Sequence, residues 1–386
     1  MKFAFPPGNL IFSSMKRFDF DVVILGGGSA GYAAARTAVG AGLKTVVIEG
    51  GREVGGLCIL RGCMPTKALL YAAEVKHLAE NAETWGVRAG KVSFDFAKVV
   101  ARKNAMIKDF ADYRVHQLNA GKFKFIRANA KFLDAHTVEL FWERRLPAGV
   151  FPEKQLPAGS RRSRKLTAKH FVIATGSSVA PSPLPQLDNI GFITSGDALT
   201  LKRLPKSLIV LGGGAIACEF AQFFARFGVK VTLIQRSGHV LKEFDADAGM
   251  EIEKVFRREN IRVFTGTKLV DARRGGKLKT ISFEQNGKSI SVSAEEILFA
   301  LGRIPNTASL GLESAGVKME QGRIVTDEFM QTSAPHIYAA GDCTGPHEIV
   351  HIAIQQGEIA GGDIVAANSP ERGRLARVFT PCAKKF

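Results

Sequence analysis

Two cysteines set five positions apart are the residues of this chain best suited to chemistry. Cys58 and Cys63 lie in the stretch 55–67, and a helix-like segment with Pro65 in its first turn follows at once. Proline there loses no hydrogen bond, so the pattern places the start of a helix beside Cys63. Unpaired amides and the positive end of a helix dipole favour the thiolate, which is the form that attacks disulfides or donates electrons.

A disulfide between these cysteines requires a break in regular helix. Five helical residues rise about 7.5 Å, whereas cysteines whose Cα atoms stand more than about 7 Å apart cannot be bridged. Gly62 supplies the freedom to bend the backbone. On its own the pair would favour two buried structural thiols, so its interpretation depends on the rest of the chain.

A strand, a glycine turn, a helix and a second strand precede the cysteines, and the second strand ends in a carboxylate. Glycines in such a turn allow the bend, the close approach of a pyrophosphate and the packing of helix on strand. A carboxylate 23 positions after the first glycine can accept hydrogen bonds from the ribose of an adenosine. The order predicts a dinucleotide-binding fold rather than a plain structural turn. Its parts are the strand 21–25, Gly26, Gly28, Gly31, the helix 33–41, the strand 44–48 and Glu49.

Residues 207–236 repeat this arrangement almost step for step. Two such folds imply two dinucleotides, and a dithiol pair between them implies electrons that move from one dinucleotide to the other and on to sulfur. The second copy consists of the strand 207–211, Gly212, Gly214, Ala217, a helix, the strand 229–234 and Gln235, which takes the place of Glu49.

The residue at position 235 bears on which nicotinamide is used. A carboxylate there would accept from the 2′-hydroxyl of NAD and repel a 2′-phosphate. Gln235 followed by Arg236 removes that repulsion and offers a guanidinium to phosphate, which favours NADPH over NADH. An arginine after a strand is also often only surface charge, so both nicotinamides stay open.

Three further strands end in turns. Thr175 and Gly176 follow the run 171–174, Gly302 follows 298–301, and Asp342 follows 337–341. An aspartate at such a strand end can hydrogen-bond ribityl or phosphate-linked hydroxyls. Asp342 could equally cap the helical pattern that runs from about residue 349 to residue 367.

Together these motifs resemble the pyridine nucleotide-disulfide oxidoreductases, and within them the branch of dihydrolipoyl dehydrogenase, mercuric reductase and glutathione reductase. The resemblance covers about residues 18–370. It implies an α/β fold of two Rossmann-like dinucleotide-binding domains, the NAD(P) domain inserted into the FAD domain. The expected segments are an FAD-binding part at 18–198, an NAD(P)-binding part at 199–321 and an FAD-domain return at 322–386.

The resemblance also implies roles for single residues. Cys58 would be the interchange thiol that meets the substrate and Cys63 the charge-transfer thiol against the flavin. Lys67 and Glu219 would form an ion pair near the flavin N5, although Glu219 also fits an exposed acid in the first turns of a helix. The implied cofactor contacts are Gly26, Gly28, Gly31, Glu49, Lys67, Thr175, Gly176 and Asp342 for FAD, and Gly212, Gly214, Ala217, Gln235, Arg236 and Gly302 in the second fold.

The implied activity is that of an FAD-dependent NAD(P)H:disulfide oxidoreductase, most like dihydrolipoyl dehydrogenase, acting on a small-molecule or lipoyl-type disulfide. The family continues into a C-terminal domain that forms the homodimer and supplies a His-Pro pair as acid–base catalyst. No His is followed by Pro in this chain, so full activity and dimerisation are in doubt. The alternative is a truncated flavoprotein with only NAD(P)H oxidase or quinone-type activity, or with FAD binding alone.

Bulk composition narrows the remaining classes. The 386 residues carry a net charge of +17, and the segment 144–169 holds eight of the cations against one acid. No aromatic residues interleave its basic core, so we expect a solvated surface hairpin and no nucleic acid. The sequence holds no apolar run of membrane-spanning length, predicts no metal site, and shows five cysteines without a secretory leader, which indicates a reducing, cytoplasmic location. Met15 is a possible true start.

Overall fold

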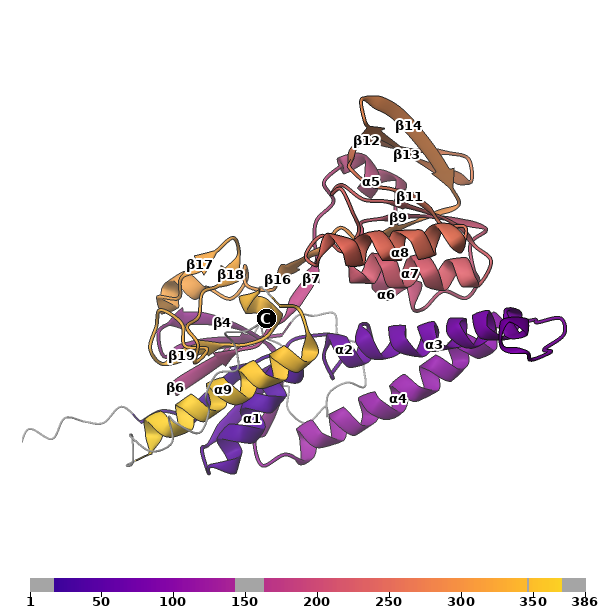
Figure 1. Cartoon of the computed structure of the whole chain (residues 1–386). Helices are drawn as coiled ribbons and strands as arrows, with labels where there is room; N and C mark the ends of the chain where they lie inside the picture. The colour runs from indigo at the N-terminus through magenta and orange to yellow at the C-terminus, as the bar shows by residue number, and fades with distance from the viewer. Residues whose placement is uncertain (1–16, 143–162, 346, 370–386) are drawn as a thin grey trace, which may run out of the picture.

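The computed structural model describes residues 17–142, 163–345 and 347–369, and it contains two parallel sheets that stand apart along the molecule (Figure 1). Residues 143–162, which form most of the basic segment predicted at 144–169, lie outside this description, as do residues 370–386. Within the described ranges, no helix has the length and apolarity that crossing a bilayer requires.

The first sheet runs in the order β3-β2-β1-β6-β5-β4. Strand β5 pairs with the first residues of β6, and β19 pairs with the last residues of β6. Strands β1, β2, β3, β6 and β19 are parallel, whereas β4 and β5 form an antiparallel extension. The bounds are β1 (Phe20–Leu25), β2 (Thr45–Glu49), β3 (Lys124–Arg127), β4 (Asn129–Asp134), β5 (Thr137–Phe141), β6 (Arg164–Ile173) and β19 (Ile337–Ala339).

Both faces of this sheet are buried. Along β1 the side chains alternate, so Val22 and Ile24 pack in the cluster that contains α1 (Ser29–Gly40) and α9 (Val350–Asn368), while Val23 and Leu25 pack in the opposite cluster. The two helices approach closely because Gly357 has no side chain, and a Cβ there would collide with the carbonyl of Ala30. Helix α9 therefore packs closely on the first turn of α1, which follows the glycine turn after β1.

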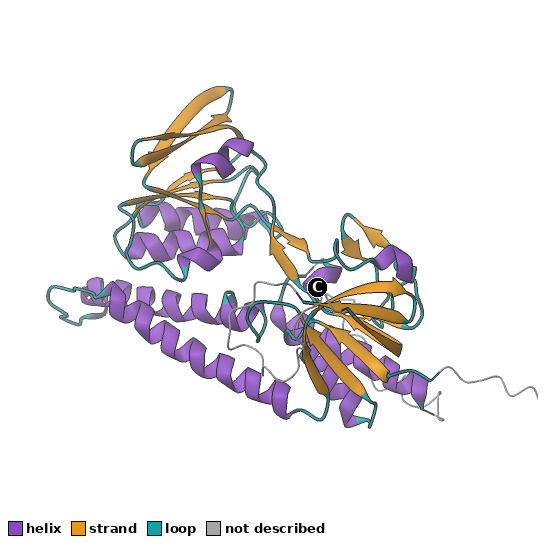
Figure 2. Ribbon diagram, turned by 180° about the vertical axis from the view of Figure 1, so that it is seen from behind, coloured by secondary structure: helices purple, strands orange, loops and turns teal. Residues whose placement is uncertain are grey.

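The second sheet repeats the arrangement on a smaller scale. Its parallel strands run in the order β11-β10-β9-β15-β8, and α7 and α8 pack on one face (Figure 2). A three-stranded antiparallel sheet, β12-β13-β14, covers the other face. The bounds are β8 (Ile193–Thr194), β9 (Ser207–Leu211), α7 (Ala215–Arg226), β10 (Lys230–Ile234), α8 (Ala246–Arg258), β11 (Arg262–Phe264), β12 (Thr267–Gly275), β13 (Leu278–Gln285), β14 (Lys288–Ala294) and β15 (Glu296–Phe299).

A helical arm extends from the first sheet and runs below the second (Figure 1). It contains α2 (Leu57–Leu60), α3 (Cys63–Glu80), the short helix η1 (Ala82–Trp85) and α4 (Phe96–Ala120). Leu69 and Ala73 of α3 are buried in the same cluster as Phe220 and Phe223 of α7. The helix that begins at the second cysteine is therefore packed against the second nucleotide fold.

The remaining elements connect these layers. Strands β7 (Ser177–Val179) and β16 (Arg303–Pro305) pair with each other where the chain passes between the two sheets. The smaller pieces are α5 (Pro185–Ile190), α6 (Ser195–Ala198), η3 (Leu312–Ala315), β17 (Met319–Glu320), β18 (Arg323–Ile324) and η4 (Asp342–Thr344). The predicted α/β class with two parallel nucleotide-type folds is confirmed, while the predicted segment boundaries at residues 198 and 321 stay predictions.

Candidate redox site

The two cysteines lie on either side of a helix break at Gly62. Helix α2 ends at Leu60, α3 begins at Cys63, and Gly62 between them has φ −129° and ψ −121°. A Cβ on Gly62 would stand 2.9 Å from the carbonyl oxygen of Leu57 and 3.2 Å from the Cα of Cys58. The chain therefore folds back on itself, as the sequence predicts, and brings Cys63 against Cys58.

The two sulfurs differ sharply in acidity. Cys58 is half-buried and Cys63 is exposed. The Cys58 thiol donates a hydrogen bond that stabilises the Cys63 thiolate, and this bond, the Cys63 amide at the start of α3 and the ammonium of Lys67 lower the pKa of Cys63 to about 6. The same hydrogen bond and burial raise the pKa of Cys58. At neutral pH the pair is one thiolate and one thiol.

Two ion pairs fasten α3 to α7. Lys67 pairs with Glu219, as the family resemblance implies. Seven residues further along each helix, Glu74 accepts a hydrogen bond from Arg226. The two pairs recur at the same spacing because residues seven apart share a helix face.

Arg226 is the better buried of these cations. Its side chain is 11% exposed, and it donates to both carboxylate oxygens of Glu259, at 3.1 Å from Nε and 2.9 Å from Nη2. Glu259 is itself 13% exposed and also accepts from Nε2 of Gln222 at 3.0 Å. Sequence reasoning missed this group, although the equal spacing from 67 to 74 and from 219 to 226 with reversed charge is a readable signal.

The first glycine turn lies directly beside the cysteine segment. Gly26 has φ +108°, which favours glycine, and a Cβ there would collide with the carbonyl of Ala174. A Cβ on Gly56, two residues before Cys58, would stand 2.9 Å from the Cα of Gly28. The turn and the cysteine segment therefore meet backbone to backbone through two glycines, and Gly31 is buried in the first turn of α1.

Glu49 closes the same turn from the end of β2. Its Oε2 accepts from the amide of Gly27 at 2.8 Å, and its Oε1 accepts from the amide of Gly51 at 2.6 Å. Carboxylate oxygens each accept more than one hydrogen bond, so both can still receive ribose hydroxyls. The donor set fits an adenine dinucleotide.

Residues from three distant strand ends meet beside this turn. Ser177 donates to Oδ2 of Asp342 at 2.6 Å, and Nε of Arg303 donates to the Ser177 hydroxyl at 2.8 Å. The Thr175 hydroxyl donates to the carbonyl of Asn306 at 2.7 Å, and Gly176 has φ +69°. Gly302 accepts from the amide of Ala180 through its carbonyl at 3.0 Å. Asp342 opens η4, so its carboxylate is oriented by Ser177 at the start of a helical turn.

The second glycine turn has the same construction. Gly212 has φ +115° and would collide with the carbonyl of Ala300 if it carried a Cβ. A Cβ on Gly213 would stand 2.8 Å from Cγ of Gln235, as one on Gly27 would stand 3.2 Å from Oε2 of Glu49. Gly214 has open space around it and caps α7, in which Ala217 is buried. Gln235 is buried against the turn, whereas Arg236 is exposed.

Comparisons with known proteins agree with this geometry. The sequence model described as "Pyridine nucleotide-disulphide oxidoreductase" matches residues 20–357. The chain is 35% identical over 345 residues to a mercuric reductase of Bacillus cereus, covering 89% of this chain and 51% of that protein. It is 36% identical over 344 residues to a dihydrolipoyl dehydrogenase of Bacillus subtilis (strain 168), covering 89% of this chain and 71% of that protein.

A solved structure is also similar. The copper(II) complex of RclA, an HOCl-induced flavoprotein disulfide reductase from Escherichia coli, superposes with a TM-score of 0.73 at 27% identity, covering 88% of this chain and 69% of that one. The chain thus spans about half the length of the Bacillus cereus mercuric reductase and about two thirds of the RclA chain.

Proposed function

Since the chain belongs to the pyridine nucleotide-disulphide oxidoreductase family, we propose that it passes electrons from a nicotinamide dinucleotide through FAD to the Cys58–Cys63 pair and on to a disulfide acceptor. The observation that carries this proposal is the helix break at Gly62, which brings the exposed Cys63 at the start of α3 against Cys58, whose thiol hydrogen bond lowers the pKa of Cys63. A structural pair of buried thiols would have no reason to keep one sulfur exposed and ionised at neutral pH.

The FAD site would be the first glycine turn with its neighbours. Gly26, Gly28 and Gly31 would face the pyrophosphate, Glu49 the adenosine ribose, and Thr175, Gly176 and Asp342 the flavin half of the molecule. When bound, FAD accepts a hydride equivalent from reduced nicotinamide and delivers two electrons to sulfur. Support comes from the positive φ of Gly26, which forms the turn, and from the fixed carboxylate of Glu49.

The sulfur chemistry follows from the two pKa directions. Reduction of a Cys58–Cys63 disulfide breaks the S–S bond with two electrons and takes up one proton, which resides on Cys58 while Cys63 stays a thiolate. Transfer of that proton along the hydrogen bond to Cys63 makes Cys58 the attacking thiolate toward an acceptor disulfide. The first acceptor thiolate leaves and takes the proton from Cys63. The Cys63 thiolate then attacks the Cys58 sulfur of the mixed disulfide, which restores the Cys58–Cys63 bond and expels the second acceptor thiolate, and water protonates that thiolate. Cys58 is therefore our proposed interchange thiol and Cys63 our proposed charge-transfer thiol.

Lys67 and Glu219 would support this chemistry electrostatically. The Lys67 ammonium lowers the pKa of Cys63, and Glu219 on α7 holds that ammonium in place. The Lys67–Glu219 pair also joins α3 to α7, so it would couple the position of the two cysteines to the position of the second glycine turn.

The second glycine turn would take the nicotinamide dinucleotide through Gly212, Gly214, Ala217 and Gly302. We favour NADPH over NADH because the amide of Gln235 occupies the place of a carboxylate and leaves no negative charge to repel a 2′-phosphate. The exposed guanidinium of Arg236 would meet that phosphate.

The acceptor we propose is a small-molecule or lipoyl-type disulfide, by likeness to the dihydrolipoyl dehydrogenase of Bacillus subtilis. The family is also typically dimeric, and we propose a homodimer in the cytoplasm. Coupled turnover tests the function: FAD-loaded protein should oxidise NADPH only when a disulfide such as lipoamide is present, and Cys58→Ser should abolish thiol release. NADPH oxidation that consumes oxygen and is unaffected by that substitution would indicate an oxidase-type flavoprotein instead.

A further inference from the structure

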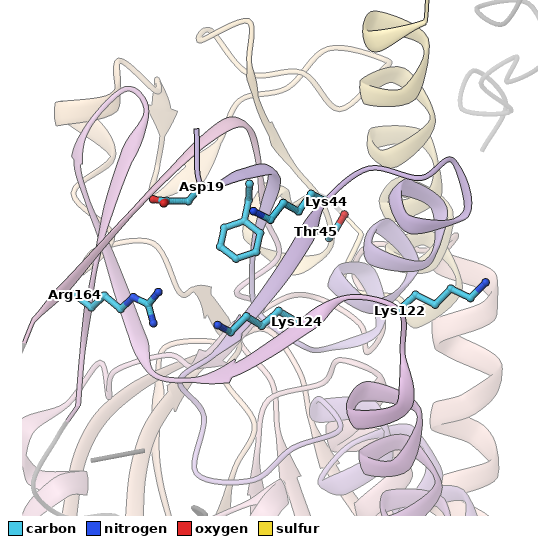
Figure 3. Close-up of a pocket in the computed structure, with 7 residues that line it drawn as sticks. Asp19, Lys44, Thr45, Lys122, Lys124 and Arg164 are labelled. Atoms are coloured by element: carbon cyan, nitrogen blue, oxygen red, sulfur yellow. The ribbon is translucent and has the colours of Figure 1, made fainter. Parts of the chain in front are cut away.

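A cavity of about 400 Å³ lies at the amino-terminal ends of neighbouring parallel strands of the first sheet (Figure 3). The glycine turn follows the carboxyl end of β1, and Glu49 is the last residue of β2. The cavity therefore lies at the opposite ends of the strands from the redox site. Its lining consists of Asp19, Phe20, Lys44, Thr45, Lys122, Lys124 and Arg164.

Cations dominate this lining. Three strands of this sheet each bring one: Lys124 opens β3, Lys44 precedes the adjacent β2, and Arg164 opens β6 on the far side of β1. Lys124 and Arg164 point toward each other (Figure 3). Nζ of Lys44 lies 5.3 Å from the centroid of the Phe20 ring. Lys122 points away from the group (Figure 3). No residue in the described ranges forms an ion pair with any of these four cations.

Asp19 is the one acid in the lining, and its carboxylate already accepts hydrogen bonds from Thr167. Its Oδ2 accepts from the amide of Thr167 at 2.9 Å and from the Thr167 hydroxyl at 3.0 Å. These bonds, together with Arg164 and Lys44, lower the pKa of Asp19. The carboxylate points to the side away from Lys44 and Lys124 (Figure 3).

Four cations gathered within a Debye length of one another, with the single carboxylate of Asp19 among them, keep a net positive charge and repel one another, and an anion relieves that repulsion. Phosphate suits the group because a guanidinium fork and ammonium groups hydrogen-bond several of its oxygens at once. The volume is within the range of small-molecule sites, roughly 300–1,000 Å³. We propose that Lys44, Lys124 and Arg164 form a binding site for a small anion that carries phosphate groups. This site is independent of the redox function.

Calorimetric titration of the FAD-loaded protein with sodium tripolyphosphate at low ionic strength tests the proposal. The double variant K124Q/R164Q removes two cations of the site, and R273Q/K277Q removes one arginine and one lysine from the exposed hairpin of β12 and β13. We expect at least about a tenfold weaker affinity in the first variant, since two charge-assisted hydrogen bonds are lost, and wild-type affinity in the second. Equal losses in both variants would mean that tripolyphosphate responds to diffuse charge, and no binding to the wild type would mean that the cations form no site. Either result would overturn the proposal.

A second arm separates soluble phosphate compounds from lipid headgroups. Co-sedimentation with phosphatidylglycerol vesicles is compared with phosphatidylcholine vesicles, in the presence and absence of tripolyphosphate. Tripolyphosphate binding without vesicle binding supports the site with a soluble ligand. Vesicle binding that K124Q/R164Q abolishes and tripolyphosphate displaces supports it with a headgroup. Vesicle binding that neither treatment changes argues against it.

Discussion

Replacing Arg226 with glutamine should lower the free energy of unfolding by about 2–3 kcal/mol. The substitution removes the cation that joins α3, α7 and the end of α8, since Arg226 bonds Glu74 on one side and Glu259 on the other. Breaking a buried ion pair costs about 3–5 kcal/mol when the remaining charge stays unpaired. The loss is smaller here because Glu259 keeps its hydrogen bond from Gln222, and because Glu74 is 44% exposed and can be hydrated.

Urea denaturation followed by circular dichroism measures this loss, and hydrogen exchange localises it. Faster exchange should be confined to the facing surfaces of α3 and α7 around Glu74 and Arg226 and to the end of α8 at Glu259. The Lys67–Glu219 pair lies about 10 Å away along both helices and should stay intact. Glu74→Gln should cost less than about 1 kcal/mol, as expected for a partly exposed partner. Arg273→Gln, on the exposed face of β12, serves as the matched control. An R226Q protein within about 0.5 kcal/mol of wild type would refute the assignment of Arg226 as the link between the folds.

Three further predictions concern the site itself. Alkylation of Cys63 as a function of pH should show a midpoint of about 6. Cys58→Ala should move that midpoint up toward the ordinary thiol value of 9.0, because the hydrogen bond from Cys58 is the largest cause of the lowered pKa. An unchanged midpoint in the variant would contradict the role given to that hydrogen bond. Gly62→Ala should slow formation of the Cys58–Cys63 disulfide, because the added Cβ would stand 2.9 Å from the Leu57 carbonyl oxygen. The control Gly40→Ala, where nothing lies within 4 Å, should form the disulfide at the wild-type rate. Peptide mapping at successive times of oxidation measures both rates, and equal rates would contradict the role given to Gly62. Arg236→Gln should reduce kcat/KM for NADPH by about tenfold and leave that for NADH unchanged, since one charge-assisted hydrogen bond to phosphate is lost; equal effects on both cofactors would show that Arg236 does not read the 2′-phosphate.

The sequence predicted what depends on local spacing. The helix break at Gly62, the two glycine turns and the carboxylate at the end of β2 follow from residues close together in the chain. The pairing of Lys67 with Glu219 joins distant segments, and it was reached through the family resemblance rather than through periodicity.

What the sequence did not predict depends on contacts between segments far apart. Glu74, Arg226 and Glu259 come from three helical segments. The seven-residue spacing from Lys67 and Glu219 signals the first pair only once that ion pair is known, and no local pattern brings in Glu259. The cavity lined by Lys44, Lys124 and Arg164 likewise exists only because the sheet places β2, β3 and β6 near one another. The basic segment at 144–169 contributes Arg164 to this cavity, and residues 143–162 lie outside the described ranges.

The most direct test of the account asks whether nicotinamide delivers electrons to the two sulfurs. FAD-loaded, air-oxidised protein is treated anaerobically with one equivalent of NADPH, alkylated at neutral pH and mapped by mass spectrometry, with an untreated sample in parallel. The account predicts that both Cys58 and Cys63 become alkylated only after NADPH. Loss of the yellow flavin colour with both cysteines still joined would contradict it.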